Sequence, residues 1–232
     1  MFTIKRNLSS GNVLFLAAVI LFCLFQDAQA SEPSSRKGII DLRNWNFSKE
    51  GVVELNGEWG FYPFKYYTPG QLFTGKDSNP IYVSVPGNWK EYSTGKNKMP
   101  SFGYATYRVK LVLNDIYLSP KQSLALKLSD IFSAYKLWID TTLVFQQGVP
   151  GKNLAEHQPK ISSSIITFLP SKDTITITLQ AANYFASQKS GILSPVELGL
   201  FDQENAQSRM KGLWYIGGAV FSFCSLLNKK EN

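Results

Sequence analysis

Two segments in which apolar and polar residues alternate strictly constrain this chain more than any other feature. In residues 104–113, one side of the alternation is apolar, with Ala105, Tyr107, Val109, Leu111 and Leu113. The other side carries Thr106, Arg108 and Lys110. Residues 174–179 alternate just as strictly between threonine and Ile or Leu. A period of two with β-branched and aromatic residues predicts strands with one buried and one solvated face.

Further short apolar runs of the same kind extend the prediction over most of the chain. Ten strands are expected, at Val52–Leu55, Glu58–Tyr62, Ile81–Val85, Tyr104–Leu113, Leu124–Leu128, Ala134–Ile139, Thr142–Gln146, Ser162–Leu169, Thr174–Ala181 and Val196–Leu200. Turn-forming pairs separate these runs: Asn56-Gly57, Pro86-Gly87, Asp140-Thr141 and Pro150-Gly151. Asp140-Thr141 stands between two apolar runs, where a tight hairpin is expected. No long helical period lies between residues 38 and 200, so the pattern predicts an antiparallel β-sandwich or jelly roll.

The N-terminus has the three parts of a secretory signal peptide. Lys5 and Arg6 precede the apolar run Val13–Phe25, and Ala28 and Ala30 then form a small-residue site. A transmembrane anchor fits less well, because about 20 apolar residues are needed to cross the hydrocarbon of a bilayer. We therefore expect residues 1–30 to be removed, a short linker at 31–37, and an exported protein on the periplasmic or extracellular face.

The C-terminal end changes character again. Residues 203–211 are polar and permit a helix, and Gly212–Leu227 carries no charge. At 1.5 Å per residue this stretch is about 24 Å long, close to the length of a membrane span. Trp214 and Tyr215 near its start and Lys229-Lys230 after its end are typical of a span with its positive end inside. This pattern favours insertion in the inner membrane. A buried terminal helix is the alternative that the sequence does not exclude.

Charge and cysteine content exclude several functions. The formal net charge is +7, but the basic residues are scattered and form no stripe that could follow phosphates, so a nucleic-acid partner is not expected. The two cysteines, Cys23 and Cys224, both lie in the terminal apolar segments. The region between them therefore offers no disulfide, thiol catalyst or cysteine-bound metal.

Groups suited to catalysis are few. His157 is the only histidine, so no metal site with two histidines can form, and its polar surroundings predict a solvated loop residue. No G-x-S-x-G motif, Walker loop or dinucleotide-binding glycine pattern occurs. Asp130 and Asp140 flank one strand, where carboxylates usually form turns. The sequence thus favours a binding module without a cofactor or metal over an enzyme.

Aromatic residues are the more informative group. They recur at strand ends and in the adjoining loops: Trp45, Trp59, Tyr62, Trp89, Tyr92, Tyr104, Tyr107, Tyr135, Trp138 and Tyr184. Flat aromatic faces stack on the apolar faces of sugars. Trp59, Tyr107 and Trp138 are in phase with buried strand faces and are expected in the core. Trp89 and Tyr92 follow Pro86-Gly87 in a loop of mixed polarity and are better candidates for ligand contact.

The order of several motifs carries a resemblance to a known family. These motifs are Leu55-Asn-Gly-Glu-Trp-Gly-Phe-Tyr62, Val85-Pro-Gly-Asn-Trp89, Gly103-Tyr-Ala-Thr-Tyr-Arg108, Ser133-Ala-Tyr-Lys-Leu-Trp-Ile139 and Ala182-Asn-Tyr184. In this order residues 38–202 resemble the extracellular jelly-roll domain of seven-transmembrane receptors with diverse intracellular signalling modules. They are more distantly similar to the sugar-binding, galactose-binding-like domain of family 2 glycosidases.

The resemblance implies a jelly-roll sensor that binds carbohydrate or a related small polar ligand. It also implies tethering to the membrane and signalling through another part of a receptor or another membrane signalling protein. Only one apolar segment follows the domain, so residues 203–232 are expected as a juxtamembrane helix and a truncated first transmembrane segment. The alternatives are a membrane-tethered structural or protein-interaction domain and a degenerate glycoside hydrolase.

Six residues are the resulting candidates for ligand contact: Trp89, Tyr92, Arg108, Tyr135, Asn183 and Lys189. The family's asparagine near its last strands corresponds to Asn183, and a glycine-containing loop follows it at residues 187–191. Arg108 and Lys189 are suited to carboxylate or hydroxyl oxygens, and Asn183 can both donate and accept hydrogen bonds. A structural role is the alternative for each, Asn183 as a turn former and Arg108 as a surface charge.

Overall fold

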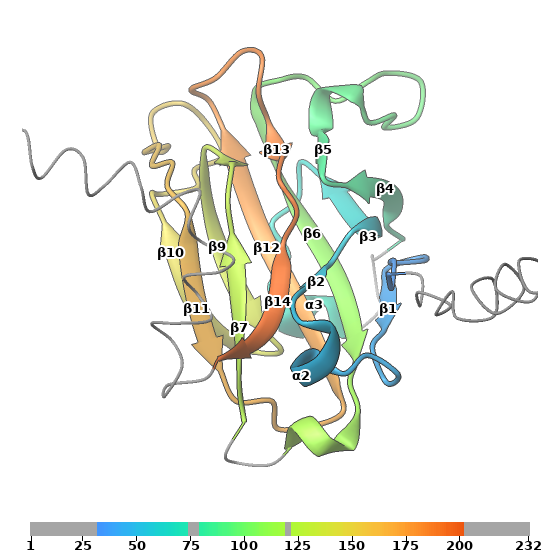
Figure 1. Ribbon diagram of the computed structural model, residues 1–232. Coiled ribbons are helices and arrows are strands. Elements are labelled where there is room, and N and C mark those ends of the chain that lie inside the picture. The colour runs from blue at the N-terminus through green and yellow to red at the C-terminus, as the bar shows by residue number, and fades with distance from the viewer. Residues whose placement is uncertain (1–31, 74–78, 119–121, 202–232) are drawn as a thin grey trace, which may run out of the picture. The chain divides into compact units, whose positions relative to one another are not determined.

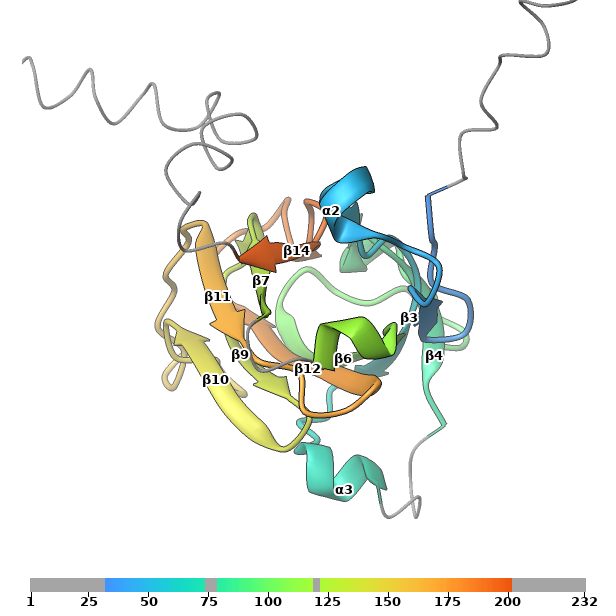
Figure 2. The same cartoon turned by 60° about the horizontal axis from the view of Figure 1, so that its bottom comes forward.

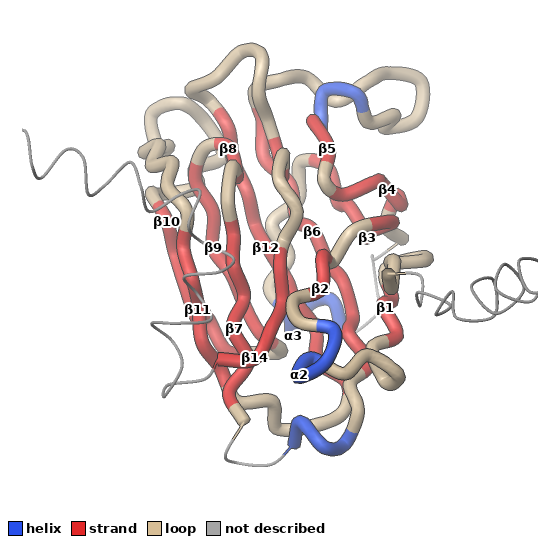
Figure 3. The backbone as a smooth tube through the Cα atoms, viewed as in Figure 1, coloured by secondary structure: helices blue, strands red, loops and turns tan. Residues whose placement is uncertain are grey.

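The computed structural model describes residues 32–73, 79–118 and 122–201, and these form an antiparallel β-sandwich. The elements are, in chain order, β1 (Ile39–Asp41), α2 (Phe47–Glu50), β2 (Val53–Glu54), β3 (Gly57–Pro63), α3 (Pro69–Phe73), β4 (Ile81–Val85), β5 (Gly87–Asn88), the 3₁₀ turn η1 (Trp89–Glu91), β6 (Gly103–Val112), the 3₁₀ turn η2 (Asp115–Leu118), β7 (Ser123–Leu128), β8 (Ile131–Phe132), β9 (Ala134–Ile139), β10 (Thr142–Gln147), β11 (Ser164–Phe168), β12 (Thr174–Asn183), β13 (Gly191–Ile192) and β14 (Glu197–Phe201). Figure 3 shows how strongly strands predominate over helices.

Two ten-residue strands form the centre of the larger sheet. β6 and β12 pair antiparallel along their whole length, with Gly103 opposite Asn183 and Val112 opposite Thr174. This seven-stranded sheet has the order β10-β9-β12-β6-β3-β4, and β1 pairs with β6 in parallel. The two segments of strict alternation in the sequence therefore lie side by side at the centre of the fold.

A four-stranded sheet in the order β11-β7-β14-β2 packs on one face of the larger sheet, as Figures 1 and 2 show. A small three-stranded sheet, β5-β13-β8, joins the loops at the upper end of Figure 1. The facing surfaces of the two larger sheets bury one continuous core, which includes Trp59, Tyr107, Leu111, Leu126 and Leu198. The predicted all-β sandwich is confirmed.

The ten predicted strands all appear, most with their ends within one or two residues of the prediction. The predicted hairpin at Asp140-Thr141 is confirmed, since Thr142 pairs with Ile139 and Asp140 adopts a positive φ of 52°. β1, β5, β8 and β13 are strands of two or three residues that periodicity did not indicate. Ser35, in the predicted linker, is buried, and its hydroxyl donates to the Glu58 carbonyl at 2.6 Å.

One expectation about the larger sheet is wrong. The threonine side of β12 was expected in solvent, yet Thr176, Thr178 and Gln180 are buried. The segment from residue 64 through α3 crosses this outer face, on the side away from β7 and β14 (Figure 2). Alternation within a strand does not reveal a loop that covers the polar face from elsewhere in the chain.

No helix among the described residues is long and apolar enough to span a membrane. The predicted signal peptide at 1–30 and the predicted membrane segment within 203–232 lie outside the residues that the structure describes.

Candidate ligand-binding surface

Aromatic rings gather at the end of the larger sheet where β6 begins and β12 ends. We call this group the aromatic surface: Phe64, Tyr66, Phe102, Tyr104, Tyr184 and Phe185. Tyr104 belongs to the outer face of β6, since its neighbour Ala105 points into the core. Its ring centroid lies 4.8 Å from that of Tyr66 and 6.0 Å from that of Phe64, so the three rings form a continuous group.

Phe64 is held in position by an unusual backbone conformation. Its φ is 55°, a left-handed value that costs an L-residue with a Cβ about 1–2 kcal/mol. The Phe64 amide donates to the Tyr104 carbonyl at 2.8 Å, which anchors the conformation to β6. The residue is nevertheless 46% exposed, so burial does not explain why a bulky side chain stands here. Backbone strain of this kind often occurs where a side chain is presented for function.

Two tyrosine hydroxyls connect the aromatic surface to the loop between β10 and β11. The Tyr66 hydroxyl donates to the Gly151 carbonyl at 3.2 Å, and the Tyr184 hydroxyl donates to the Lys152 carbonyl. Burial, together with the nearby Tyr184 and Tyr104, raises the pKa of Tyr66 well above its usual range. Both tyrosine hydroxyls therefore stay protonated and donate these hydrogen bonds. The hydrogen bonds fix the orientation of the two rings.

Asn183 orders the two loops that carry the most exposed rings, Phe102 and Phe185, which are 48% and 64% exposed. Its side-chain nitrogen donates to the carbonyls of Ser101 at 2.9 Å and Ala186 at 2.7 Å. Its side-chain oxygen accepts from the amides of Phe185 and Ala186. Since Asn183 itself is fully buried, the structure gives it a positioning role, and direct ligand contact stays a prediction.

Three other predicted contact residues are also buried. The Trp89 indole donates to the Pro100 carbonyl at 3.0 Å and the Ser101 carbonyl at 3.2 Å. The Tyr92 hydroxyl donates to the Ser84 carbonyl at 2.6 Å. Burial raises the pKa of Tyr135 to about 12. Trp89 and Tyr92 were expected to be accessible because a Pro-Gly pair precedes them; instead, they lie within the core cluster.

The six predicted residues do not form one site. Trp89 and Asn183 meet at the Ser101 carbonyl, and Asn183 also donates to the Lys189 carbonyl at 3.1 Å. The exposed Lys189 ammonium lies 5.4 Å from the centroid of the Phe132 ring. Arg108 is far along β6 from Tyr104 and lines a separate pocket with Tyr62 and other residues.

Sequence reasoning had identified Tyr104 and Tyr184 as aromatic residues at strand ends but missed Phe64, Phe102 and Phe185. The signal that could have found them is that each lies in a loop within two residues of a strand end, where no alternation requires an apolar residue. An exposed phenylalanine at such a position indicates a binding surface better than a tryptophan in a motif does, because the tryptophan can instead be buried in the core.

The histidine expectation is also wrong. His157 is buried, its Nε2 lies 2.8 Å from the Ser133 hydroxyl, and its ring packs edge-on against Tyr184. Burial lowers its pKa. The loop around it is polar in sequence, but it folds back onto the end of the sheet, so the ring is covered. His157 therefore packs against the Tyr184 ring of the aromatic surface from the buried side.

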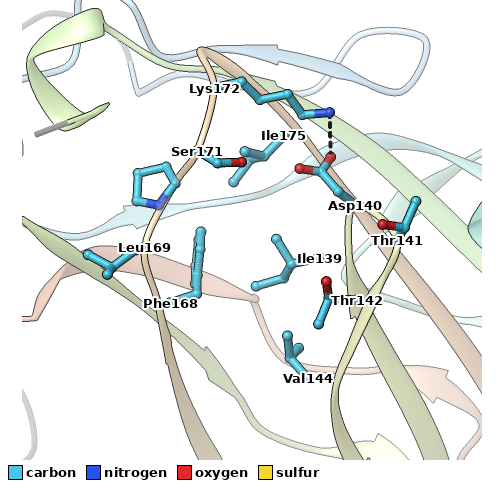
Figure 4. A pocket seen from close by; sticks show the side chains of 11 residues that line it. Ile139, Asp140, Thr141, Thr142, Val144, Phe168, Leu169, Ser171, Lys172 and Ile175 are labelled. Carbon is cyan, nitrogen blue, oxygen red and sulfur yellow. Dashed lines mark ion pairs between the residues drawn. The ribbon is translucent and has the colours of Figure 1, made fainter. Parts of the chain in front are cut away.

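A second feature is a cavity of about 400 Å³ at the other end of the sandwich (Figure 4). It lies between the β9–β10 hairpin and the β11–β12 connection, and Figure 4 shows Ile139, Val144, Phe168 and Ile175 around it. Its size is within the range of small-molecule sites. This apolar lining is the edge of the hydrophobic core between β10 and β11, the edge strands of the two larger sheets.

The charged groups of this cavity already have partners within the protein. Asp140 Oδ1 accepts from the Thr176 amide at 2.9 Å and lies 3.2 Å from the Lys172 ammonium (Figure 4). A hydroxylated ligand would have to displace these contacts, whereas an apolar group would not. The cavity therefore suits an apolar group better than a sugar, and the aromatic surface is the stronger candidate for the predicted ligand.

The described residues contain no group of three or more His, Cys, Asp and Glu side chains that could hold a metal ion. What this part of the chain offers is an antiparallel β-sandwich with an exposed set of aromatic rings fixed by hydrogen bonds at one end.

Comparison with known proteins yields matches among solved structures alone. No family model matches the chain, and no curated protein matches it. A β-glucuronidase of an uncultured Clostridium sp. is similar with a TM-score of 0.48 and 16% identity, over 66% of this chain and 29% of the enzyme. For Faecalibacterium prausnitzii β-glucuronidase the TM-score is 0.47 and the identity 15%, over 63% of this chain and 31% of the enzyme.

A third similar structure is Bifidobacterium dentium β-glucuronidase complexed with coumarin-3-O-glucuronide, with a TM-score of 0.49 and 12% identity, over 63% of this chain and 29% of the enzyme. This chain thus spans less than a third of each of these three enzymes. The three structures are β-glucuronidases, and no family model supports the receptor family. Similarity at this level carries no conclusion about what this chain binds or catalyses.

Proposed function

We propose that this protein is a ligand-recognition domain that binds a carbohydrate, or a related small polar ligand, on the aromatic surface. The observation that carries the proposal is the exposed Phe64 packed on Tyr104, with the exposed Phe102 and Phe185 in the loops next to the start of β6 and the end of β12. A pyranose ring has C–H faces that stack on aromatic rings and hydroxyl edges that need polar partners. Large exposed aromatic groups are otherwise unfavourable in water, so their clustering supports a binding role.

Polar groups at the margin of the aromatic surface support a hydroxylated ligand. The Glu156 side chain is exposed, and its carboxylate accepts from the Lys152 amide at 3.1 Å and the Asn153 side chain at 2.7 Å. These hydrogen bonds lower the pKa of Glu156, which stays ionised at neutral pH. Because the Tyr184 hydroxyl binds this same loop, Glu156 lies near the rings and can accept from ligand hydroxyls.

The proposal is tested by a thermal-shift and calorimetric screen of the purified protein against mono- and oligosaccharides. A bound ligand should raise Tm in proportion to RT ln(1 + [L]/Kd), and the Phe64→Gly variant should lose the shift. Leu169→Ala is the matched control, since Leu169 is exposed at the opposite end of the sandwich, beside the apolar cavity. A saccharide that stabilises wild type and Phe64→Gly equally would rule out the aromatic surface as its site.

We further propose that the domain is exported and serves as the sensor of a membrane signalling protein, to which it is tethered by residues 203–232. The support is the signal-peptide pattern, the apolar C-terminal segment, and the absence of cysteine between Cys23 and Cys224. N-terminal sequencing of protein isolated from the host should find a first residue near Ser31. An intact Met1 on protein from the cytoplasm would contradict export.

A further inference from the structure

A pocket of about 230 Å³ lies on the outer face of the larger sheet, where β1, β3, β4 and β6 come together at the right of Figure 1. Cationic and aromatic side chains dominate its lining: Lys37, Arg108, Lys110, Tyr62 and Tyr82. We call it the basic pocket. It shares no residue with the aromatic surface or with the cavity of Figure 4.

The turn before β1 builds this pocket by inserting between two strands of the sheet. The Gly38 amide donates to the Glu58 carbonyl of β3 at 2.9 Å, and the Lys110 amide of β6 donates to the Gly38 carbonyl at 2.8 Å. Gly38 thus occupies the place that β3 would otherwise take beside Lys110. The insertion brings Lys37, remote in sequence, to the same pocket as Arg108 and Lys110.

The backbone at Lys37 is strained, since its φ is 47°. A glycine would adopt this conformation without strain, yet the position carries an exposed lysine that lines the pocket. The same relation holds at Phe64 in the aromatic surface. A strained backbone that presents a long charged side chain is consistent with selection for that side chain rather than for stability.

The charge around the basic pocket is strongly positive. None of the pocket-lining residues is acidic. The nearest carboxylate that the contacts place here is Glu58, and its Oε2 accepts from the Lys37 main-chain amide at 2.9 Å. Within the described residues, no ion pair joins Lys37 or Lys110 to a carboxylate. Cations held near one another repel, so an anion placed between them would gain from each of them.

The two tyrosines add a hydrogen-bonding group and an apolar wall. Tyr62 is buried beside Arg108, and burial raises its pKa while the Arg108 charge lowers it. Its hydroxyl therefore stays protonated at neutral pH. The Tyr82 ring is 44% exposed and stands beside Gly38, where an added Cβ would lie 3.5 Å from the ring. Tyr82 lines the pocket, so its ring can contact a flat or cyclic group bound there.

We propose that the basic pocket binds the oxyanion group of a sugar acid, with the oxyanion between Arg108 and the two lysines and the sugar ring against Tyr82. Guanidinium groups bind carboxylates and sulfates through two parallel hydrogen bonds, and lysines add charge. The volume is below the 300–1,000 Å³ or so of drug-sized sites, so it accommodates about one ring. This site is independent of the carbohydrate proposed for the aromatic surface.

The test is calorimetric titration of the full-length protein with galacturonate, galactose and inorganic sulfate, each at low and high salt. Galacturonate should bind, its affinity should fall as salt rises, and galactose should not bind at this pocket. Arg108→Gln should weaken galacturonate about tenfold or more, because it removes a charge-assisted contact. Lys37→Gly should weaken it too, without loss of Tm, because glycine relieves the strained backbone.

Two control variants separate the sites. Lys49→Gln removes an exposed charge on α2, beside the other sheet, and should leave galacturonate affinity unchanged. Phe64→Gly should also leave the galacturonate affinity unchanged, so the basic pocket is tested separately from the aromatic surface. If sulfate binds as tightly as galacturonate, the pocket recognises the oxyanion alone and the sugar-ring contact is refuted. If neither anion binds, or if binding survives Arg108→Gln and Lys37→Gly, the pocket is not an anion site.

Discussion

Ser133 and His157 form a buried pair, with 2.8 Å between the serine Oγ and the histidine Nε2. Ser133 connects β8 to β9, and His157 lies in the loop after β10, so the pair fastens that loop to the end of the sheet. Nδ1 of His157 is buried and has no hydrogen-bond partner in the described part of the chain. A ring in this setting is stable only while it is neutral.

The buried ring predicts a stability that depends on pH. Burial lowers the folded-state pKa of His157 from its usual 6.5, so below pH 6.5 the unfolded chain binds more protons than the folded one. The stabilisation that comes from the buried neutral ring is fully present above pH 6.5. It is lost as the pH falls from there through the lowered folded-state pKa. Tm should therefore drop as the pH falls below about 6.5, and His157→Gln should remove most of that drop.

Glutamine is the suitable replacement because it can keep a hydrogen bond to Ser133 without titrating. Exposed carboxylates such as Glu156, whose pKa is lowered from 4.5, titrate below this window and leave it interpretable. The measurement is Tm at half-unit pH steps for both proteins. Parallel curves for wild type and His157→Gln as the pH falls below 6.5 would show that another group is responsible.

The left-handed backbone of Phe64 predicts an unusual order of stability among its variants. Phe64→Gly and Phe64→Ala remove the same ring contacts with Tyr104, but alanine keeps the strain of φ 55°. Glycine relieves it, so Phe64→Gly should be more stable than Phe64→Ala by about 1 kcal/mol. Urea denaturation of both variants measures the difference. At most positions an alanine variant is more stable than a glycine variant. If Phe64→Ala is the more stable of the two here, the backbone at residue 64 is not strained.

Asn183 should be far more sensitive to substitution than its place at the very end of β12 suggests. Asn183→Ala leaves the carbonyls of Ser101 and Ala186 and the amide of Phe185 without their buried partner. The expected loss is about 2–3 kcal/mol. Asn153→Ala, in an exposed loop, is the control and should cost much less. If the two variants unfold at the same urea concentration, Asn183 does not hold the loops as inferred.

Much of the fold was predictable because its strands carry local signals. Tyr107 and Ile177 each lie in a segment that alternates by itself, and these segments pair with each other in the structure. β1, β5, β8 and β13 were not predictable, since a strand of two or three residues is too short to show a period. Their pairing depends on where the rest of the chain places them.

The candidate site was less predictable than the fold, for a different reason. A tryptophan after Pro-Gly has the same sequence signature whether it faces solvent or the core, and Trp89 lies in the core. The aromatic surface depends on contacts between loops, such as Tyr66 with Gly151, that are 85 residues apart in the chain. Arg108 was identified correctly as a charge on the outer face of β6, but its neighbour Lys37 comes from a turn whose position only the structure reveals.

Two threonines on the outer face of the larger sheet predict opposite responses to the same substitution. The Thr106 hydroxyl accepts from the Tyr67 amide at 3.0 Å and donates to the Lys65 carbonyl at 2.8 Å, which holds the segment after β3 against the sheet. The Thr178 hydroxyl is buried without a hydrogen-bond partner among the described residues. Valine has nearly the shape of threonine but lacks the hydroxyl, so it isolates this difference.

Thr106→Val should therefore destabilise the protein by about 1–3 kcal/mol and speed hydrogen exchange at the Tyr67 amide, which loses its acceptor. Thr178→Val should be neutral or stabilising, because it removes a buried hydroxyl that gains nothing from burial. Denaturation and amide exchange on both variants measure the contrast. Equal effects of the two substitutions would mean that Thr106 does not fasten the segment that carries Phe64 and Tyr66, and the aromatic surface would lose its support from the sheet.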